Sequence, residues 1–374
     1  MEVKDDCIRT HHIAVAVGTR PEIIKMAPVI RALRSYPNIK LLLVNTAQHY
    51  DHAMSGQFLE AIGQADIELN AGGRSRADCI GVIVSDLGAT LHHYRPDALL
   101  VHGDTNTTLA SALAANAEGV FLAHVEAGLR SYDRAMPEEH NRVLTDHLAD
   151  LCFAPTANNR DNLVRESIPL DRIAVVGNTI VEAVSDQLPA LARQRSILDQ
   201  YRLTRDQYLL ATIHRPENTD DPNRLAHIFR TFNESSIPVV IPLHPRTRSQ
   251  LTGFGLWPLT SNCIIINPLD APEFLALESN ARLLISDSGG VAEESTILRR
   301  RLVIVRNSTE RPEAIEAGFA SLTSPDSMGD AIKHALQSPL PDAPSPYGDG
   351  TAARAIALTL VSTLNSVQKI GAYV

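Results

Sequence analysis

Acidic side chains follow three apolar segments in the first half of the chain. Asp104 comes directly after one such segment, Glu126 closes the next, and Glu138 stands at the start of a helical pattern. Asp104 and Glu138 could equally serve as helix caps. Glu126 interrupts an apolar run, where burial is expected to raise the pKa of its carboxyl group and suit it to acid or base chemistry. Carboxyl groups that differ in protonation state can together supply an acid and a base.

A first candidate phosphate site is the segment GTRPEIIK, residues 18–25. Its glycine permits a tight turn, and its proline suits the first position of a helix, whose free N–H groups attract an anion. Arg20 and Lys25 would add positive charge. A capped helix with solvated basic side chains is the alternative interpretation of this segment.

A second candidate phosphate site is the segment SDSGGVAEES, residues 286–295. Ser288, Gly289 and Gly290 stand between an apolar segment and a helical pattern, and glycines let the backbone approach diphosphate oxygens. Glu294 lies further along the same helical pattern and could accept hydrogen bonds from the hydroxyl groups of a ribose. The alternative is an ordinary turn followed by a solvated glutamate.

Basic residues after apolar segments complete the candidate set. His214 in HRPEN could contact phosphate or transfer a proton, although a lone histidine is more often structural. Arg142 in MPEEHNR and Arg311 in TERPE lie in comparable loops or helix starts. The other histidines lack metal-ligand spacing, and neither G-x-S-x-G nor a cysteine–histidine pair indicates a covalent hydrolase. The sequence therefore predicts no metal site.

The secondary-structure elements that must position these residues share one sequence pattern. Short runs rich in valine, isoleucine and leucine alternate with helical patterns, which predicts parallel sheets covered by helices on both faces. Strands are expected at residues 13–18, 40–46, 97–103, 121–126, 151–155, 172–177, 208–213, 238–243, 263–267, 282–286 and 302–306. A continuous helical pattern over 181–202 separates the first six runs from the other five.

The chain is thus expected to form two doubly wound α/β domains. They would occupy residues 1–178 and 179–350, and a terminal helix in 351–374 could pack on either of them. Ligands of such sheets bind beyond the carboxyl ends of the strands, so we expect the active site in a cleft between the domains.

Composition narrows the class of protein. The 374 residues carry a formal charge of -9, which argues against nucleic acid or an anionic membrane as a partner. No apolar run reaches the roughly 18 residues of a transmembrane helix, and the first residues lack the apolar stretch of a signal peptide. We therefore expect a cytoplasmic protein without membrane insertion, whose four cysteines are reduced thiols.

Taken together and in this order, the motifs resemble those of the UDP-N-acetylglucosamine 2-epimerase family. They are GTRPEIIKMAP, TAQHYDHAMS, HGDTNTTLA, HVEAGLRSYDRAMPEEHNRVLTDH, VGNTIVEAV, HRPEN, SDSGGVAEES and TERPE, within residues 18–313. The resemblance implies a glycosyltransferase-B type of fold with two Rossmann-like domains, a homodimer, and no metal or redox cofactor. It also implies elimination of UDP through a 2-acetamidoglucal intermediate, followed by re-addition with the opposite configuration at C2.

The resemblance also assigns roles to individual positions. Asp104, Glu126 and Glu138 match catalytic carboxylates, and His214 matches a catalytic histidine beside the diphosphate. The positions that match substrate-binding residues are Arg20, Lys25, His49, Arg142, Phe274, Ser288, Gly289, Gly290, Glu294 and Arg311. Among these, Phe274 corresponds to an aromatic residue beside the uracil and Glu294 to the ribose ligand.

Three functions remain open at this point. The leading one is reversible epimerisation of UDP-N-acetylglucosamine to UDP-N-acetylmannosamine. A close relative could instead hydrolyse the intermediate to free N-acetylmannosamine and UDP, or act on a modified UDP-sugar such as UDP-2,3-diacetamido-glucuronate. The third is a sugar-nucleotide-binding protein without catalysis, which is disfavoured because all four catalytic positions are filled.

Overall fold

The structure is a computed structural model that describes residues 10–48 and 62–371. It divides into two compact units, which we call unit 1 (Met1–Ala183 and Tyr347–Val374) and unit 2 (Val184–Pro346). The chain therefore leaves unit 1 once and returns to it after unit 2 is complete. None of the helices in the described ranges is long and apolar enough to span a lipid bilayer.

Unit 1 contains a parallel sheet of seven strands in the order β3-β2-β1-β4-β5-β6-β7. The strands are β1 (His11–Val17), β2 (Ile39–Asn45), β3 (Ile67–Glu68), β4 (Ala98–His102), β5 (Phe121–Val125), β6 (Leu151–Ala154) and β7 (Ile173–Val175). The strand order reverses between β1 and β4, which pair directly. This reversal is where a doubly wound sheet offers a ligand site beyond its strand ends.

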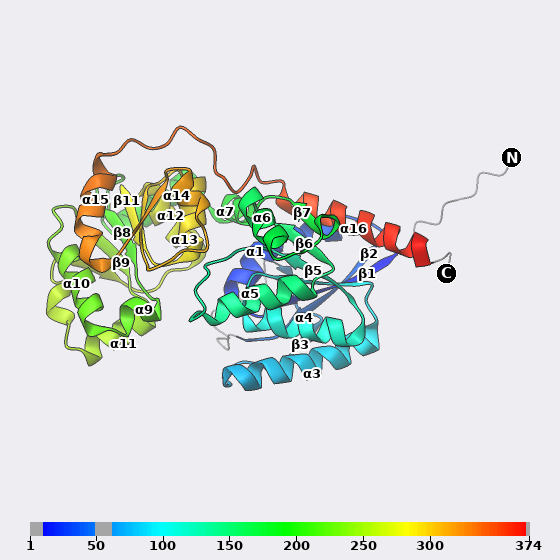
Figure 1. Cartoon of the computed structure of the whole chain (residues 1–374). Coiled ribbons are helices and arrows are strands. Elements are labelled where there is room, and N and C mark those ends of the chain that lie inside the picture. Colours follow the sequence, from blue (N-terminus) through cyan, green and yellow to red (C-terminus); the bar gives the residue numbers. More distant parts are fainter. Residues whose placement is uncertain (1–9, 49–61, 372–374) are drawn as a thin grey trace. The chain divides into compact units, whose positions relative to one another are not determined.

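Helices cover both faces of this sheet. They are α1 (Arg20–Arg34), α3 (Arg76–Tyr94), α4 (Asn106–Glu118), α5 (Pro137–Leu148), α6 (Ala157–Arg165) and α16 (Ala352–Gly371). Helices α1 and α16 share one apolar core with the sheet, whereas α3 and α4 contribute to the core on the opposite face (Figure 1).

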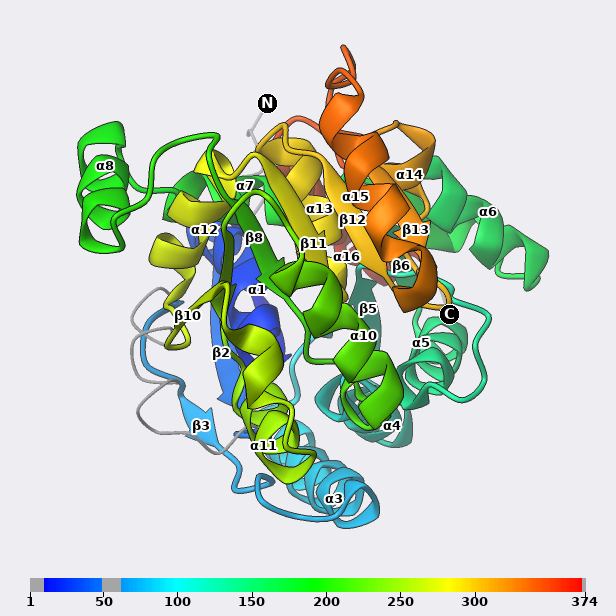
Figure 2. The same ribbon diagram turned by 90° about the vertical axis from the view of Figure 1, so that its left-hand side faces the viewer.

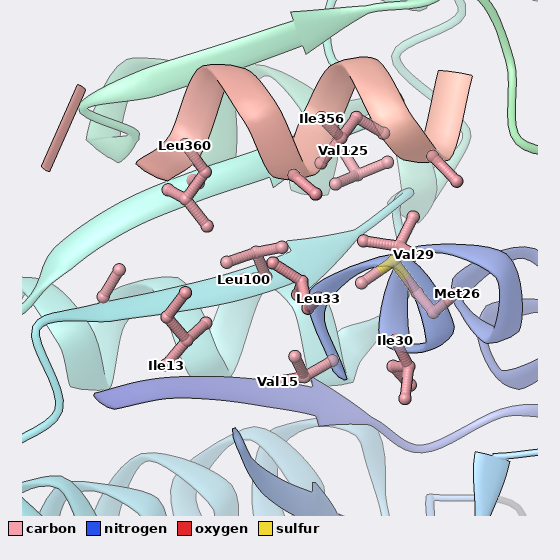
Figure 3. Packing of buried hydrophobic residues seen from close by; sticks show 14 of the residues in the cluster. Ile13, Val15, Met26, Val29, Ile30, Leu33, Leu100, Val125, Ile356 and Leu360 are labelled. Carbon is pink, nitrogen blue, oxygen red and sulfur yellow. The ribbon is translucent and has the colours of Figure 1, made fainter. Parts of the chain in front are cut away.

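Helix α16 completes the first of these cores although it follows unit 2 in the sequence. Figure 3 shows Ile356 and Leu360 of α16 near Leu100 and Val125 of the sheet and Val29 of α1. All five side chains are almost fully withdrawn from solvent. Burial of such aliphatic side chains contributes about 1.5–3 kcal/mol each, so α16 is an integral part of unit 1.

Unit 2 repeats the design with a parallel sheet of six strands in the order β10-β9-β8-β11-β12-β13. The strands are β8 (Leu209–Thr212), β9 (Val239–Pro242), β10 (Cys263–Ile266), β11 (Leu283–Ser286), β12 (Leu302–Val305) and β13 (Ala320–Thr323). Here the order reverses between β8 and β11, which also pair directly.

Helices again cover both faces of the sheet in unit 2. Those named below are α8 (Leu191–Gln200), α10 (Pro222–Asn233), α12 (Ala271–Asn280), α13 (Gly289–Ile297) and α15 (Met328–Gln337). Helices α10 and α15 pack on one face (Figure 2), and α8, α12 and α13 contribute to the core on the other.

The prediction of two doubly wound parallel sheets is confirmed, and all eleven predicted strands are present with small shifts of their ends. Two details differ from the prediction. The edge strands β3 and β13 were not expected. The helical pattern over 181–202 is interrupted, because α7 (Ile180–Gln187) ends before Pro189 and α8 begins after it. Proline disfavours a helical conformation of the preceding residue and cannot donate the helical hydrogen bond.

Candidate active site

In unit 1, three neighbouring strands bring the predicted residues to one edge of the sheet. Gly18 follows β1, Asp104 follows β4 with only Gly103 between them, and Glu126 follows β5. Because β1, β4 and β5 are adjacent and parallel, these positions lie together at the reversal of the strand order. The structure thus places the acidic loops where the sheet topology favours a ligand.

Glu126 is buried, with 8% of its surface exposed, and its Oε2 atom is the centre of a polar cluster. Lys25 Nζ lies 2.5 Å from this oxygen, Asn178 Nδ2 donates to it over 3.3 Å, and His102 Nε2 is 3.5 Å away. The expected burial is confirmed. The sequence did not reveal the ammonium group, which favours the ionised carboxylate and therefore the form that can accept a proton.

The backbone of Glu126 adopts a left-handed conformation with φ at 69°. This region is costly for a residue with a β-carbon and persists where the surrounding structure enforces it, often at functional sites. The conformation turns the chain sharply after β5 and so supports the assignment of Glu126 to the site.

Asp104 is held by a buried arginine. Arg142 donates from Nε (2.9 Å) and Nη2 (2.6 Å) to Asp104 Oδ2, and its Nη1 atom lies 2.6 Å from Glu139 Oε2. Burial alone would raise the pKa of Glu139, but N–H groups of Ser131 and Tyr132 and the charge of Arg142 together lower it. The Arg142 side chain therefore binds the Asp104 carboxylate within the protein. Its contact with substrate stays a prediction.

Glu138 differs from its neighbour Glu139. It is half-buried at the start of α5, and its carboxyl group makes no hydrogen bond to any of the residues that the structure describes.

Glu22 holds the turn of the GTRPEIIK segment from within the protein. Its Oε2 atom accepts from the N–H groups of Gly18 (2.9 Å) and Thr19 (2.7 Å). These two donors of the GTRPEIIK turn are used inside the protein, which favours the capped-helix alternative for its backbone.

In unit 2, His214 and a buried aspartate form a hydrogen-bonded pair. His214 Nδ1 lies 3.2 Å from Asp287 Oδ1, and the same carboxylate accepts from the N–H groups of His214 and Arg215 and from Asn218 Nδ2. Burial alone would raise the pKa of Asp287, but these partners hold it below its usual value. The pair fixes the ring orientation and leaves Nε2 at the opposite edge of the ring.

The glycine segment of unit 2 lies directly after β11. Helix α13 begins at Gly289, and its N-cap residue Ser288 makes no side-chain cap. Arg311 is packed against this start: a β-carbon on Gly289 would lie 2.6 Å from its Nη1 atom. Arg311 is itself anchored by Glu293 (2.7 Å) and Glu310 (2.6 Å). An uncapped helix start beside a guanidinium group is well suited to an anion.

Glu294 in α13 has an acidic neighbour that the sequence did not indicate. Glu278 of α12 is fully buried, and burial raises the pKa of its carboxyl group well above the usual value, an effect to which Glu294 adds. The folded protein therefore favours the protonated form of Glu278. Phe274 lies one helical turn earlier in α12 and is half-buried against the same apolar core.

The sequence analysis did not single out Asn178 and Asp287, although the sequence contains a signal for both. Both stand shortly after a strand, which is the signal that singled out Asp104. Glu22 follows Thr19 at the spacing of a capping box. His102 is the last residue of β4, directly before Gly103, and the sequence analysis did not single it out either. Of the two remaining predicted site residues, Arg20 is the half-buried first residue of α1, and His49 lies outside the residues that the structure describes.

Known proteins resemble this chain over most of its length. A family model described as UDP-N-acetylglucosamine 2-epimerase matches residues 31–361. The UDP-N-acetylglucosamine 2-epimerase of Methanococcus maripaludis is 40% identical over 359 residues, which cover 92% of this chain and 97% of that protein. The UDP-2,3-diacetamido-2,3-dideoxy-D-glucuronate 2-epimerase of Pseudomonas aeruginosa is 35% identical over 352 residues, which cover 92% and 98%.

A solved structure shows the same likeness in three dimensions. The crystal structure of Methanocaldococcus jannaschii UDP-GlcNAc 2-epimerase, in complex with UDP-GlcNAc and UDP, matches with a TM-score of 0.86 at 38% identity. The match covers 94% of this chain and 99% of that one.

Proposed function

Because the chain belongs to the UDP-N-acetylglucosamine 2-epimerase family, we propose that it interconverts UDP-N-acetylglucosamine and UDP-N-acetylmannosamine. The observation that carries this proposal is the pairing of Glu126 with Lys25 at 2.5 Å, next to the Asp104 loop at the strand ends of unit 1. Inversion at C2 requires a proton to leave one face of the sugar and return to the other. A site with several carboxyl groups can serve both faces.

The proposed reaction begins when a carboxylate removes the C2 proton. The C1–O bond breaks, its electron pair leaves with UDP, and a C1–C2 double bond forms in a 2-acetamidoglucal. A diphosphate oxygen then adds back to C1 while a proton is delivered to the opposite face of C2. Asp104, Glu126 and Glu138 are the proposed acid and base groups of unit 1.

Unit 2 is proposed to bind the nucleotide. The start of α13 at Ser288, Gly289 and Gly290 would bind the diphosphate with Arg311. His214 would donate a hydrogen bond to the diphosphate from Nε2 when both of its ring nitrogens carry a hydrogen. Glu294 would accept from the ribose and Phe274 would contact the uracil. The family resemblance further supports a homodimer in the cytoplasm, and both of these stay predictions.

Phosphorus and proton NMR of the protein with UDP-N-acetylglucosamine in deuterium oxide tests the proposal. We expect a second UDP-sugar that carries solvent deuterium at C2, because elimination exchanges this proton with the solvent. Free UDP with free N-acetylmannosamine would identify a hydrolysing enzyme instead. If the protein converts a UDP-diacetamido-glucuronate but not UDP-N-acetylglucosamine, its function is that of its Pseudomonas aeruginosa relative. An epimer that carries no deuterium at C2 would contradict the elimination mechanism.

Two neighbouring glycines are expected to respond differently to alanine. In Gly289→Ala the new methyl group meets Arg311, so we expect a loss of about 1–3 kcal/mol in the free energy of unfolding together with weaker UDP binding. In Gly290→Ala the nearest atom is Ser288 Oγ at 3.8 Å, so the fold should be unaffected. If the backbone here approaches phosphate, Gly290→Ala loses UDP affinity alone.

Urea unfolding and calorimetric titration with UDP separate these effects. The fluorescence of Trp257, the single tryptophan of the chain, reports the unfolding of unit 2. Unchanged UDP affinity in Gly290→Ala would show that the diphosphate does not approach this part of the backbone.

A further inference from the structure

A buried charged cluster lies beneath the acidic loops of unit 1. His124 of β5 is fully buried, and its two ring nitrogens both face acceptors. Nδ1 is 2.7 Å from Asp146 Oδ1, and Nε2 is 2.8 Å from the carbonyl oxygen of Gly103. A carbonyl oxygen can only accept a hydrogen bond, so Nε2 carries a hydrogen.

The second ring nitrogen faces a carboxyl group that other donors also hold. Burial alone would raise the pKa of Asp146, but His124 and Arg130 lower it. The other oxygen of Asp146, Oδ2, is occupied by Arg130 Nη1 at 2.8 Å and by the N–H group of Gly128 at 3.1 Å. Asp146 therefore links the ring of His124 to the backbone of Gly128.

The cluster continues on the other side of Arg130. Arg130 is bound on its other edge by Glu166, with nitrogen–oxygen distances of 2.7 and 2.6 Å, and so joins Asp146 to Glu166. Other titratable neighbours are His147, half-exposed and 3.7 Å from Glu166, and Cys152, whose thiol pKa is raised by burial and by Asp146. Arg172 and Asp150 lie close enough to Cys152 to affect the same thiol.

The cluster connects the backbones that carry the candidate catalytic groups. Gly103 precedes Asp104, and Gly128 follows Glu126 by two residues. Asp146 lies in α5, the helix that begins beside Glu138 and Glu139. Gly103 and Gly128 both have positive φ, at 70° and 83°, so each loop turns sharply where the cluster holds it.

We propose that His124, through its contacts with Gly103 and Asp146, is a positioning residue that fixes the Asp104 and Glu126 loops for the reaction. The proposal rests on the function proposed above. It assigns no contact with substrate to His124, which acts through the carbonyl group of Gly103 and through Asp146. Misplacement of a catalytic group by about 1 Å can cost about 100-fold in rate, so a loosened loop is expected to lower kcat.

Two amide variants separate the two hydrogen bonds of the ring. The amide nitrogen of His124→Gln can take the place of Nε2 and keep the Gly103 contact, whereas that of His124→Asn can take the place of Nδ1 and keep only the Asp146 contact. We expect His124→Asn to lower kcat about 10- to 100-fold with KM changed by less than about 3-fold, and His124→Gln to restore part of this loss. UDP affinity, which belongs to unit 2, should stay unchanged in both variants.

Nitrogen NMR of the histidine-labelled wild-type protein supplies an independent readout. The signal of His124 is identified by its absence in the variants, and we expect Nε2 of this ring to carry a hydrogen, as its contact with the carbonyl oxygen of Gly103 requires. A ring without a hydrogen on Nε2, or a normal kcat in His124→Asn, overturns the proposal even if a variant is unstable. Failure of the proposed function is distinguishable, because wild-type protein would then epimerise no UDP-sugar at all.

Discussion

Glu126→Gln is expected to turn over UDP-N-acetylglucosamine at least about 100-fold more slowly than wild-type protein, which is the usual contribution of a positioned acid or base. The substitution keeps the size of the side chain and its ability to accept a hydrogen bond. It removes the negative charge that Lys25 stabilises at 2.5 Å and with it the capacity to take a proton from C2. The loss should appear in kcat, because the change affects the chemical step.

The matched control is Glu118→Gln, which removes a carboxylate from the far end of α4 in the same unit. Glu118 contacts His92, away from the acidic loops, and its loss should leave turnover within about 2-fold of wild type. Turnover is measured by NMR and UDP affinity by calorimetry, which shows whether the nucleotide still binds. Near-normal turnover in Glu126→Gln would remove this residue from the catalytic set.

Unit 2 is expected to become less stable as the pH rises above about 4.3, because burial raises the pKa of Glu278 well above its usual value in the folded state but not in the unfolded chain. A carboxyl group with a raised pKa makes the folded protein bind more protons than the unfolded chain between the two pKa values. The free energy of unfolding therefore falls with pH in this window, by up to about 1.4 kcal/mol per pH unit.

Glu278→Gln removes this ionisation while it keeps the shape of the side chain. We expect the variant to gain stability relative to wild type as the pH rises from 5, as measured by urea unfolding with Trp257 fluorescence. The control is Glu234→Gln, which makes the same substitution at an exposed glutamate at the end of α10 in the same unit. Its free energy of unfolding should change with pH in parallel with that of wild-type protein. Parallel curves for Glu278→Gln as well would mean that Glu278 ionises normally.

The strands and the loops that follow them were predictable because the signal is local. A buried strand in a parallel sheet is continuously apolar, and the polar residue after it stands out, as Asp104 and Glu126 do. The edge strand β3 has only two residues and β13 contains Ser321 and Thr323, so neither gives such a run. The break at Pro189 was readable in the sequence, but the helical pattern on both sides outweighed it.

Partners across the sheet could not be predicted in the same way. Lys25 was assigned to a phosphate site because it shares a segment with Arg20, whereas its partner Glu126 is 101 residues away in the chain. The pairing follows from the strand order β1-β4-β5, which the apolar pattern does not encode. For the same reason, the sequence does not indicate that Asp146 and His124 are partners.

Helix α16 carries a consequence for the way the chain is made. A ribosome synthesises residues 10–183 first, then all of unit 2, and only afterwards the helix whose Ile356 and Leu360 complete the core over α1. Unit 2 is continuous in sequence and can finish folding as soon as it has emerged. The apolar surface of α1 and the sheet meanwhile remains open to water, and such surfaces in nascent chains are prone to aggregate and need chaperones. The part of the protein that begins to fold first is therefore the part that finishes last.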